Sequence, residues 1–583
     1  MGAPADASAT GTGRWSRDLL LLTVAFAALF FFRLGSYPLG NPDEGRNAEI
    51  PREMVATGDW VTPKLDGVNY FEKPPLVYWT TGAMLKVFGP SEWSMRASPA
   101  LFALAGVLLT YAAGRRLYGR ATGMAAAIVL GTSLFYFILA HILVLDMAVS
   151  VLMSATLFCF ILGVLEPPAP AGKSNLRRWF FYGLYASAAL ATLTKGLIGF
   201  LVTGAVMFLW LLVFNEWRRL RPFYLPTGVL LFLAIALPWH VLAALRNPTW
   251  FHRYIVYEHF ERFLTPAASR VGPWWYFIPI VLAGLFPWVG FLWPAIRTSV
   301  TGGWAGRSAN TKAWYLITWV AFIFVFFSYS KSKLPPYILP VFPALAVLIG
   351  RWLAEVPRWF RDGANPTRSD DESAHPLRNG LRVFSFVCGL LAVGLVLVVL
   401  RPALAKLSLA QAAELRPYVF AMAAVLVIGG IVVPWIAATE GTKRALFATV
   451  ATLVLFFAAL QCASLPEIIK PGTKALALIV RERAQPSDRV LDYHEYFHDF
   501  TFYARRLVDL VAFKGELEEE EDPAAQRSGR FMSEADFRTL WTKPGRVFVV
   551  ARRRDVEGKL FADPSFHYHV LQETEDHVLF TNR

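Results

Sequence analysis

Of the 583 residues, 55% are hydrophobic and 17% are charged, whereas an ordinary soluble protein has roughly 25% charged residues. Forty-six Phe, 20 Trp and 20 Tyr supply more apolar bulk than a soluble surface carries. The composition excludes collagen-like, disordered and disulfide-stapled chains. It predicts a polytopic α-helical membrane protein.

A net charge of +14 would fit nucleic-acid binding, but in membrane proteins Lys and Arg gather in cytoplasmic loops. We therefore expect no nucleic-acid partner. Cys159, Cys388 and Cys462 lie in apolar stretches without metal-ligand spacing, so we expect them to be packing residues. The first apolar stretch ends at Phe32 without a small-residue cleavage site, which predicts a signal-anchor helix.

Thirteen segments have the roughly 20 mainly apolar residues that a membrane-spanning helix needs, or come close to that length. With the N-terminus inside, every predicted inside loop carries at least two cations, as cytoplasmic loops do. The odd number of spans then places the C-terminus outside. The predicted spans are 18–34, 97–114, 121–139, 142–164, 179–194, 197–214, 225–245, 274–293, 313–330, 337–350, 383–400, 418–438 and 446–464.

Two domains follow from these spans. Residues 1–464 form the predicted transmembrane domain, which includes a long outer segment at 35–96. A proline and two acids at the start of 42–56 predict an amphipathic helix that lies along the membrane surface. Residues 465–583 form the predicted outer domain.

The predicted outer domain mixes two kinds of pattern. Helical periodicity occurs at 474–484 and at 533–543, where Ser533 and Asp536 have capping-box spacing. Alternating apolar residues in RVFVVARR and HVLFTN are typical of strands. The tail is therefore predicted to be a small α/β domain.

Charged residues gather on the predicted outer side, many within a few residues of a span end. An ionisable group near hydrocarbon is costly and usually functional. Long side chains that reach the headgroup level would explain each cation alone, but not the recurrence of carboxylates beside cations. The residues are Asp43, Glu44, Arg46, Glu72, Lys73, Lys195, Arg253, Glu258, Arg262, Arg270, Lys331 and Lys333.

Two of these lysines stand beside rigid proline segments. Lys73 directly precedes two prolines, and Lys333 is separated from another pair of prolines by one leucine. The backbone at both lysines is therefore expected to be stiff and extended. A lysine on such a support is a good point charge for a phosphate. Neighbouring aromatic residues such as Tyr70 would pack a lipid chain or a sugar face, or form an interfacial belt.

A divalent metal is a second expectation for this side of the membrane. A set of glutamate and histidine ligands suits zinc. The same histidines would also serve as ordinary polar residues, because no local spacing supports a site. The candidate ligands are Glu72, His252, His259 and His494.

The first outer segment resembles that of bacterial GT-C glycosyltransferases that use polyprenyl-phosphate sugars. The similar runs are DEGRNAEIPREM, GDW and YFEKPPLVYW, followed by TLTKG, EHFERF and KLPPY further along the chain. Within this group the chain is most similar to the lipid A aminoarabinose transferases, which are related to protein O-mannosyltransferases. It departs from that pattern at Asn47, where we expect Tyr, and at the second proline of KPP.

The resemblance implies a GT-C fold of about 13 transmembrane helices with a small periplasmic α/β domain. It implies transfer, with inversion, of 4-amino-4-deoxy-L-arabinose from undecaprenyl phosphate to lipid A or another envelope acceptor, within the lipids of the bacterial inner membrane and facing the periplasm. Asp43 matches the family's first-loop catalytic acid, and Asp146 is a second catalytic candidate. The residues predicted to bind substrates are Glu44, Arg46, Tyr70, Glu72, Lys73, Lys195, Glu258, Arg262, Lys331, Lys333 and Tyr337.

The role of Asp43 depends on the acceptor. A hydroxyl acceptor needs a general base such as Asp43. A phosphate acceptor is already an anion, and Asp43 would then position the donor, hold its amino group or stabilise positive charge at the anomeric carbon. In either case Lys73, Lys195 and Lys333 would stabilise the phosphate leaving group.

Three other functions are compatible with a polytopic chain. A related transferase would act on protein or on another envelope glycan. A lipid-carrier transporter or flippase would carry ionisable residues deep within several spans and an internal repeat, and neither pattern is clear. A nonenzymatic scaffold leaves the grouping of acids and lysines unexplained.

Overall fold

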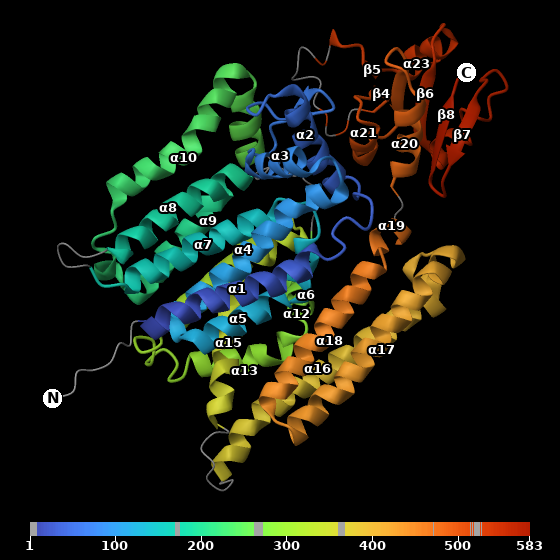
Figure 1. Cartoon of the computed structure of the whole chain (residues 1–583). Helices are drawn as coiled ribbons and strands as arrows, with labels where there is room; N and C mark the ends of the chain where they lie inside the picture. Colours follow the sequence, from blue (N-terminus) through green and yellow to red (C-terminus); the bar gives the residue numbers. More distant parts are fainter. Residues whose placement is uncertain are drawn as a thin grey trace. The chain divides into compact units, whose positions relative to one another are not determined.

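The computed structural model of the chain (Figure 1) describes residues 9–168, 175–261, 272–359, 368–469 and 472–583, apart from 514, 516, 518–524 and 526. The chain divides into two units. Unit 1 comprises residues 1–34, 99–238 and 265–463, and unit 2 comprises residues 35–98, 239–264 and 464–583.

Unit 1 consists of apolar helices. Helices α7, α8 and α9 run side by side, and α16, α17 and α18 form another group of neighbours (Figure 1). Gly350 lets α15 approach α5 closely, since a Cβ there would lie 2.5 Å from the backbone N of Ala126. The helices are α1 (Ala9–Phe31), α5 (Arg120–Gly131), α6 (Leu134–Ala140), α7 (Asp146–Leu165), α8 (Leu176–Lys195), α9 (Ile198–Phe214), η1 (Trp217–Leu220), α12 (Phe277–Gly284), η3 (Trp288–Phe291), α13 (Leu292–Ser299), α14 (Thr311–Tyr329), η4 (Pro335–Val341), α15 (Phe342–Trp359), α16 (Arg368–Leu400), η5 (Pro402–Ala405), α17 (Leu409–Thr439) and α18 (Thr442–Cys462).

Two further helices have residues in both units. Helix α4 (Glu92–Tyr118) begins in unit 2 and continues into unit 1, whereas α10 (Leu225–Arg246) begins in unit 1 and ends in unit 2. Both are long and apolar enough to cross a membrane.

The thirteen predicted spans each fall on a described helix or on a bent pair of helices. Among the described helices, eight are long and apolar enough to cross a membrane, or up to ten if each bent pair counts as one span. The pairs are α5 with α6, bent by 65°, and α12 with the helix at Trp288–Ser299, bent by 101°. The polytopic helical fold is therefore confirmed. Crossings by α1, α8 and α9 stay a prediction, which leaves the count of thirteen open.

Unit 2 is built around a six-stranded mixed sheet with the strand order β5-β4-β3-β6-β8-β7. The first four strands in this order are parallel, and β8 pairs antiparallel with both β6 and β7. The strands are β3 (Arg489–Tyr493), β4 (Asp509–Val511), β5 (Phe531–Met532), β6 (Val547–Arg552), β7 (His569–Glu573) and β8 (His577–Thr581).

Helices and a small hairpin complete unit 2. Helix α23 begins with the predicted capping box of Ser533 and Asp536, and Phe537 and Trp541 of this helix join the buried core of the sheet. The other elements are α2 (Asp43–Thr57), β1 (Lys64–Leu65), β2 (Val68–Asn69), α3 (Leu76–Phe88), the π-helix η2 (Phe251–Glu261), α19 (Leu465–Ile469), α20 (Lys474–Arg483), α21 (His498–Ala504), α23 (Glu534–Thr542) and α24 (Arg553–Val556). The small α/β domain predicted for the tail is confirmed.

The helix predicted at 42–56 is α2, but three of its four acidic side chains are not presented to solvent. Glu44, Glu49 and Glu53 are buried, because α2 packs against α21 of the tail. The outer segment that we assigned to the transmembrane domain thus shares a core with the tail.

Candidate functional site

Asp43 occupies the first turn of α2, directly after Asn41 and Pro42. An acid in the first turn is favoured by the positive end of the helix. Its side chain is 59% exposed and forms a salt bridge with Arg46 one turn later. Both predicted residues therefore lie together, and the carboxylate of Asp43 remains accessible to a substrate.

Glu44, the next residue, is buried and engaged by protein groups. Arg96 Nε and Nη2 donate to its two carboxylate oxygens at 2.8 and 2.7 Å. The backbone N–H of Gly40 donates to Glu44 Oε2 at 2.9 Å, and Arg96 also bonds the carbonyl of Tyr37. Groups of the protein itself therefore hold the carboxylate of Glu44 in place.

The tail braces the segment before Asp43 through α21. The side chain of Asn41 donates to Asp499, whose backbone N–H donates back to Asn41 Oδ1 at 3.0 Å. Tyr503 accepts the backbone N–H of Leu39 at 2.8 Å. Gly45 permits this approach, because a Cβ there would lie 2.5 Å from Asp499 N.

Burial of acids continues along α2. Glu53 accepts the backbone N–H of Gly67, and burial together with the charge of Glu49 raises the pKa of Glu53 to about 7. Asp66, in the turn between β1 and β2, pairs with Arg530 at 2.6 Å, and its burial raises its pKa well above the ordinary value. These groups join the first outer segment to the tail.

Lys73 lies among carboxylates. Its Nζ is 3.2 Å from Glu258 Oε2 and 3.8 Å from Glu72 Oε2, and it is 26% exposed. On the other oxygen of Glu258, Arg253 Nη2 lies at 3.9 Å. Two cations and two carboxylates therefore meet where α3 begins and η2 runs. The predicted set of Glu72, Lys73 and Glu258 is brought together.

The other predicted residues of unit 2 are scattered. Tyr70 is buried, so its ring belongs to the interior of the unit. His252 is exposed on η2. Arg262 and the side chain of His259 lie outside the described residues, and so does Arg270, the remaining outer cation.

A separate group forms within unit 1. Asp146 stands at the start of α7 and Lys195 at the end of α8, where Gly196 with φ of 77° ends the helix. Lys195 Nζ lies 2.5 Å from Asp146 Oδ1 and 4.6 Å from the ring centroid of Tyr337. The structure thus brings together a catalytic candidate and two substrate-binding candidates from distant parts of the chain.

Lys333 and Lys331 differ in their surroundings although they are close in sequence. Lys333 is 7% exposed and its ammonium donates to the carbonyl of Ser330. Its stem lies beside Gly272, where a Cβ would meet Lys333 Cδ at 3.2 Å. Lys331 is exposed. The buried ammonium of Lys333 is held in place by its backbone partner, whereas the side chain of Lys331 extends into solvent.

The predicted metal ligands do not form a site in the part of the chain that the structure describes. No group of three or more His, Cys, Asp or Glu side chains there has the spacing to hold an ion. His494 instead lies 3.3 Å from Glu534 and stacks on Tyr493, and Glu72 faces the ammonium of Lys73. The residues described do not fit zinc, so no chemical step is assigned to a metal.

Three partners of the predicted residues escaped the sequence reasoning. The sequence singles out none of the three, which are Arg96, just before the predicted span 97–114, and Asp499 and Tyr503 of the tail. Their roles come from hydrogen bonds across more than 50 and more than 400 positions, which no local pattern encodes. The only local signal was an arginine beside a predicted apolar span, which is costly unless it is paired.

A family model described as dolichyl-phosphate-mannose-protein mannosyltransferase matches residues 72–241. The chain is 32% identical over 383 residues to the undecaprenyl phosphate-α-4-amino-4-deoxy-L-arabinose arabinosyl transferase of Edwardsiella ictaluri, which covers 65% of each chain. It is 31% identical to the corresponding transferase 2 of Proteus mirabilis, over 59% of this chain and 60% of that one. The matches thus span somewhat less than two thirds of these relatives.

The fold extends the similarity to nearly the whole chain. The crystal structure of ArnT from Cupriavidus metallidurans bound to undecaprenyl phosphate matches with a TM-score of 0.81 and 27% identity, over 97% of this chain and 98% of that chain. In both sequence and fold, the chain is similar to the bacterial GT-C aminoarabinose transferases, and the resemblance predicted from its motifs is confirmed.

Proposed function

We propose that this protein transfers 4-amino-4-deoxy-L-arabinose from undecaprenyl phosphate to a phosphate of lipid A. The reaction would take place at the periplasmic face of the bacterial inner membrane. The observation that carries the proposal is the match over 97% of the chain to a structure solved with undecaprenyl phosphate. The similar transferases of Edwardsiella ictaluri and Proteus mirabilis, which are named for 4-amino-4-deoxy-L-arabinose, supply the sugar.

The chemistry needs a stabilised phosphate leaving group. An oxygen of the acceptor attacks the anomeric carbon from the side opposite the carrier, and the bond between that carbon and the carrier phosphate breaks. The electron pair leaves with undecaprenyl phosphate, whose charge grows as the bond lengthens. Preorganised cations stabilise such charge most effectively where water is excluded.

Lysines of this chain suit that task. Lys73 is partly exposed and shares Glu258 with Arg253. A carrier phosphate that binds Lys73 would displace one carboxylate contact, and Arg253 would keep Glu258 paired. Lys195 and Lys333 supply two further charges, each on a fixed support.

Carboxylates would act on the sugar. Asp43 is exposed at the start of α2, and with a phosphate acceptor it has no proton to remove at neutral pH. It would instead hold the donor through its amino group or stabilise the positive charge that develops at the anomeric carbon. Asp146, paired with Lys195, would orient that lysine.

A transferase with a hydroxyl acceptor is the second candidate, and the protein mannosyltransferase description of the matching family model favours it. In that reaction Asp43 would remove the proton from the hydroxyl group as a general base. The two candidates therefore differ in what happens to Asp43 and in whether the acceptor carries a phosphate.

Mass spectrometry of lipid A tests the proposal in cells. Lipid A is compared between cells without the protein and cells that express either the wild type or Asp43→Asn at equal membrane levels. We expect aminoarabinose on lipid A only with the wild type. Unmodified lipid A in all three strains, with a donor pool that is present, would contradict the proposal and favour the second candidate.

A further inference from the structure

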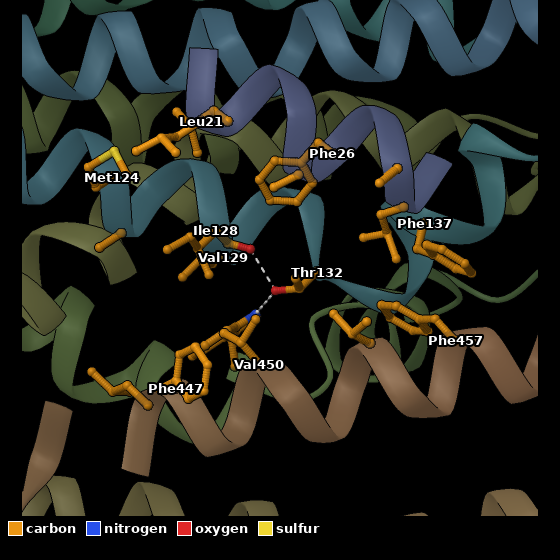
Figure 2. Close-up of a pocket in the computed structure, with 18 of the residues that line it drawn as sticks. Leu21, Phe26, Met124, Ile128, Val129, Thr132, Phe137, Phe447, Val450 and Phe457 are labelled. Carbon is orange, nitrogen blue, oxygen red and sulfur yellow. Dashed lines mark hydrogen bonds between the residues drawn. The ribbon is translucent and has the colours of Figure 1, made fainter. Parts of the chain in front are cut away.

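An apolar groove runs between three helices of unit 1, away from the residues discussed above. It is lined by α1 from Leu21 to Leu29 and by Phe32 just after this helix, by α5 from Ala121 to Val129 and by α18 from Lys443 to Gln461. Its volume is about 880 Å³, which lies within the roughly 300–1,000 Å³ of small-molecule sites. We call it the α1–α5–α18 groove (Figure 2).

The lining of the groove selects an apolar occupant. Alanines 25, 28, 125 and 458 leave room between larger aliphatic and aromatic side chains. The hydroxyl of Thr132 points into this region but is already bonded, since it donates to the carbonyl of Ile128 at 2.6 Å and accepts from Trp288 Nε1 at 3.0 Å (Figure 2). The walls therefore offer no unbonded hydroxyl at this point, and hydrocarbon fits them.

The three helices run in the same direction along the groove. Figure 2 shows Leu21 of α1, Met124 of α5 and Phe447 of α18 toward one end of the groove, and Phe137 and Phe457 toward the other. From Lys443 to Gln461 helix α18 rises about 27 Å at roughly 1.5 Å per residue, which is close to the hydrocarbon thickness of a bilayer of about 30 Å.

Cations of all three helices gather at the end where the helices start. Arg14 and Arg17 are exposed on α1, and Lys443 is exposed on α18 and lines the groove. Arg120 is the first residue of α5, and it pairs with the buried Asp18 of α1 at 2.6 Å. This ion pair links α1 to the start of α5. This end therefore carries more positive than negative charge, and the starts of α5 and α18 add helix dipoles of the same sign.

The opposite end is narrowed by aromatic rings. Phe137 of α6 stacks on Phe457 of α18, with centroids 3.9 Å apart and planes 5° from parallel. Because these two rings narrow this end of the groove, an acyl chain from the membrane would enter at the cationic end.

We propose that the α1–α5–α18 groove binds the acyl chains of a glycerophospholipid with an anionic headgroup, and that Lys443, Arg17 and Arg120 hold that headgroup. The lipid would fill the space between α18 and the helices α1 and α5, and would thereby join the α16–α18 group to the rest of unit 1.

A polyprenyl carrier also has a long apolar chain and a phosphate. In this groove, however, its phosphate would lie at the opposite end of the helices from the predicted transfer site of unit 1. Arg116, at the end of α4, covers the ring of Phe180 near the start of α8, so α8 starts on the same side as the cations of the groove. Lys195, at the other end of α8, pairs with Asp146. A carrier phosphate at the cations would lie about a helix length from these residues, whereas a structural phospholipid belongs there.

Native mass spectrometry of the full chain in mild detergent tests the proposal, after delipidation and addition of equal amounts of phosphatidylglycerol, phosphatidylethanolamine and undecaprenyl phosphate. We expect the wild type to retain phosphatidylglycerol preferentially. Ala125→Trp fills the groove and should reduce this retention at least tenfold. Lys443→Glu should reduce it about fivefold or more, given the usual attraction of one cation to an anionic surface.

Two control variants carry the same substitutions outside the groove. Ala424→Trp lies on an exposed face of α17, and Lys406→Glu lies in the exposed connection before α17; both should bind as the wild type does. Equal retention by all five proteins, or preferential retention of phosphatidylethanolamine or undecaprenyl phosphate, would overturn the proposal. If Ala125→Trp is not recovered as folded protein, the pair Lys443→Glu and Lys406→Glu decides alone.

Discussion

Asp499 of the tail and Asn41 of the first outer segment, 458 positions apart, exchange hydrogen bonds in both directions. Asp499 is buried and also accepts the backbone N–H and the hydroxyl of Thr473 at 2.7 and 2.8 Å. Because Asn41 stands two residues before Asp43, the tail holds the backbone from which the catalytic candidate projects. A domain without a candidate catalytic residue thus contributes to the site by position.

Replacing Asp499 by alanine should therefore impair transfer without touching a substrate. Thr473 and Asn41 would lose their partner, and unsatisfied buried donors cost about 1–3 kcal/mol each. We expect a lower apparent melting temperature and at least a tenfold lower kcat. Asp499→Asn should recover part of both, because its amide oxygen still accepts from Thr473. Asp563→Ala, a surface carboxylate of the same domain, is the control. A wild-type kcat in Asp499→Ala would show that Asn41 needs no such support.

Asp43→Asn preserves shape and removes the charge. Since the carboxylate is exposed and pairs with Arg46 on the surface of the same helix, stability should change little. The value of kcat should fall by roughly 10²–10³-fold, the usual effect of losing one charged catalytic group. Turnover of purified protein gives the measurement, with Glu482→Gln on the exposed face of α20 as the control. A variant that retains most of the wild-type kcat would remove Asp43 from the mechanism.

Neutralising Lys73 or Lys333 should act chiefly on the donor. If the lysines bind the carrier phosphate equally in the ground and transition states, the loss appears as a higher KM for the donor with little change in kcat. We expect about a tenfold rise in KM for Lys73→Met, because Lys73 is partly exposed and shares its partner with Arg253. Lys543→Met, exposed in the tail, is the control. An unchanged donor KM in both site variants would exclude them from phosphate binding.

The helices were predictable because apolar length is a local property. Each predicted span falls on a helix, and the α/β tail appeared in the periodicity of its own segments. The capping box at Ser533 was predicted from the spacing of two residues and is present. The pairing of the first outer segment with the tail was not predictable in this way, because Asp499 and Asn41 meet only after the sheet and α2 have formed.

In the candidate site, too, local sequence indicated some features, whereas others depend on contacts between distant residues. Glu72 and Lys73 are neighbours in sequence and both were predicted to bind substrate, and their charged groups lie 3.8 Å apart. Glu44, in contrast, was predicted to bind substrate as one of the outer charged residues in the motif that carries the resemblance, and its carboxylate forms a salt bridge with Arg96. Sequence shows which ionisable groups are near the membrane surface; it does not show which of them the protein itself neutralises.

Stability of unit 2 should depend on pH through its buried acids. The pKa of Glu53 is raised from 4.5 to about 7 by burial and by Glu49. Between these values the folded state keeps a proton that the unfolded chain has released, so the free energy of unfolding falls as pH rises through this window. The full shift corresponds to about 3 kcal/mol. Burial raises the pKa of Asp66 and Asp492 in the same direction.

Glu53→Gln isolates one of these groups. The apparent melting temperature of the wild type should decline between pH 4.5 and 7, and the decline should be smaller in Glu53→Gln, whose side chain does not ionise. Glu482→Gln, exposed on α20, should follow the wild type. Identical pH profiles for the wild type and Glu53→Gln would contradict the assigned role of Glu53.

The acceptor decides between the two transferase reactions most directly. Purified protein is given undecaprenyl-phosphate aminoarabinose with either intact or chemically dephosphorylated lipid A, and the products are counted by mass spectrometry. A phosphate is nucleophilic once ionised, with a second ionisation near pH 6 by analogy with phosphate monoesters. We predict transfer to intact lipid A, with a rate that rises with this ionisation, and no transfer to the dephosphorylated form. Equal product with both acceptors would contradict the account.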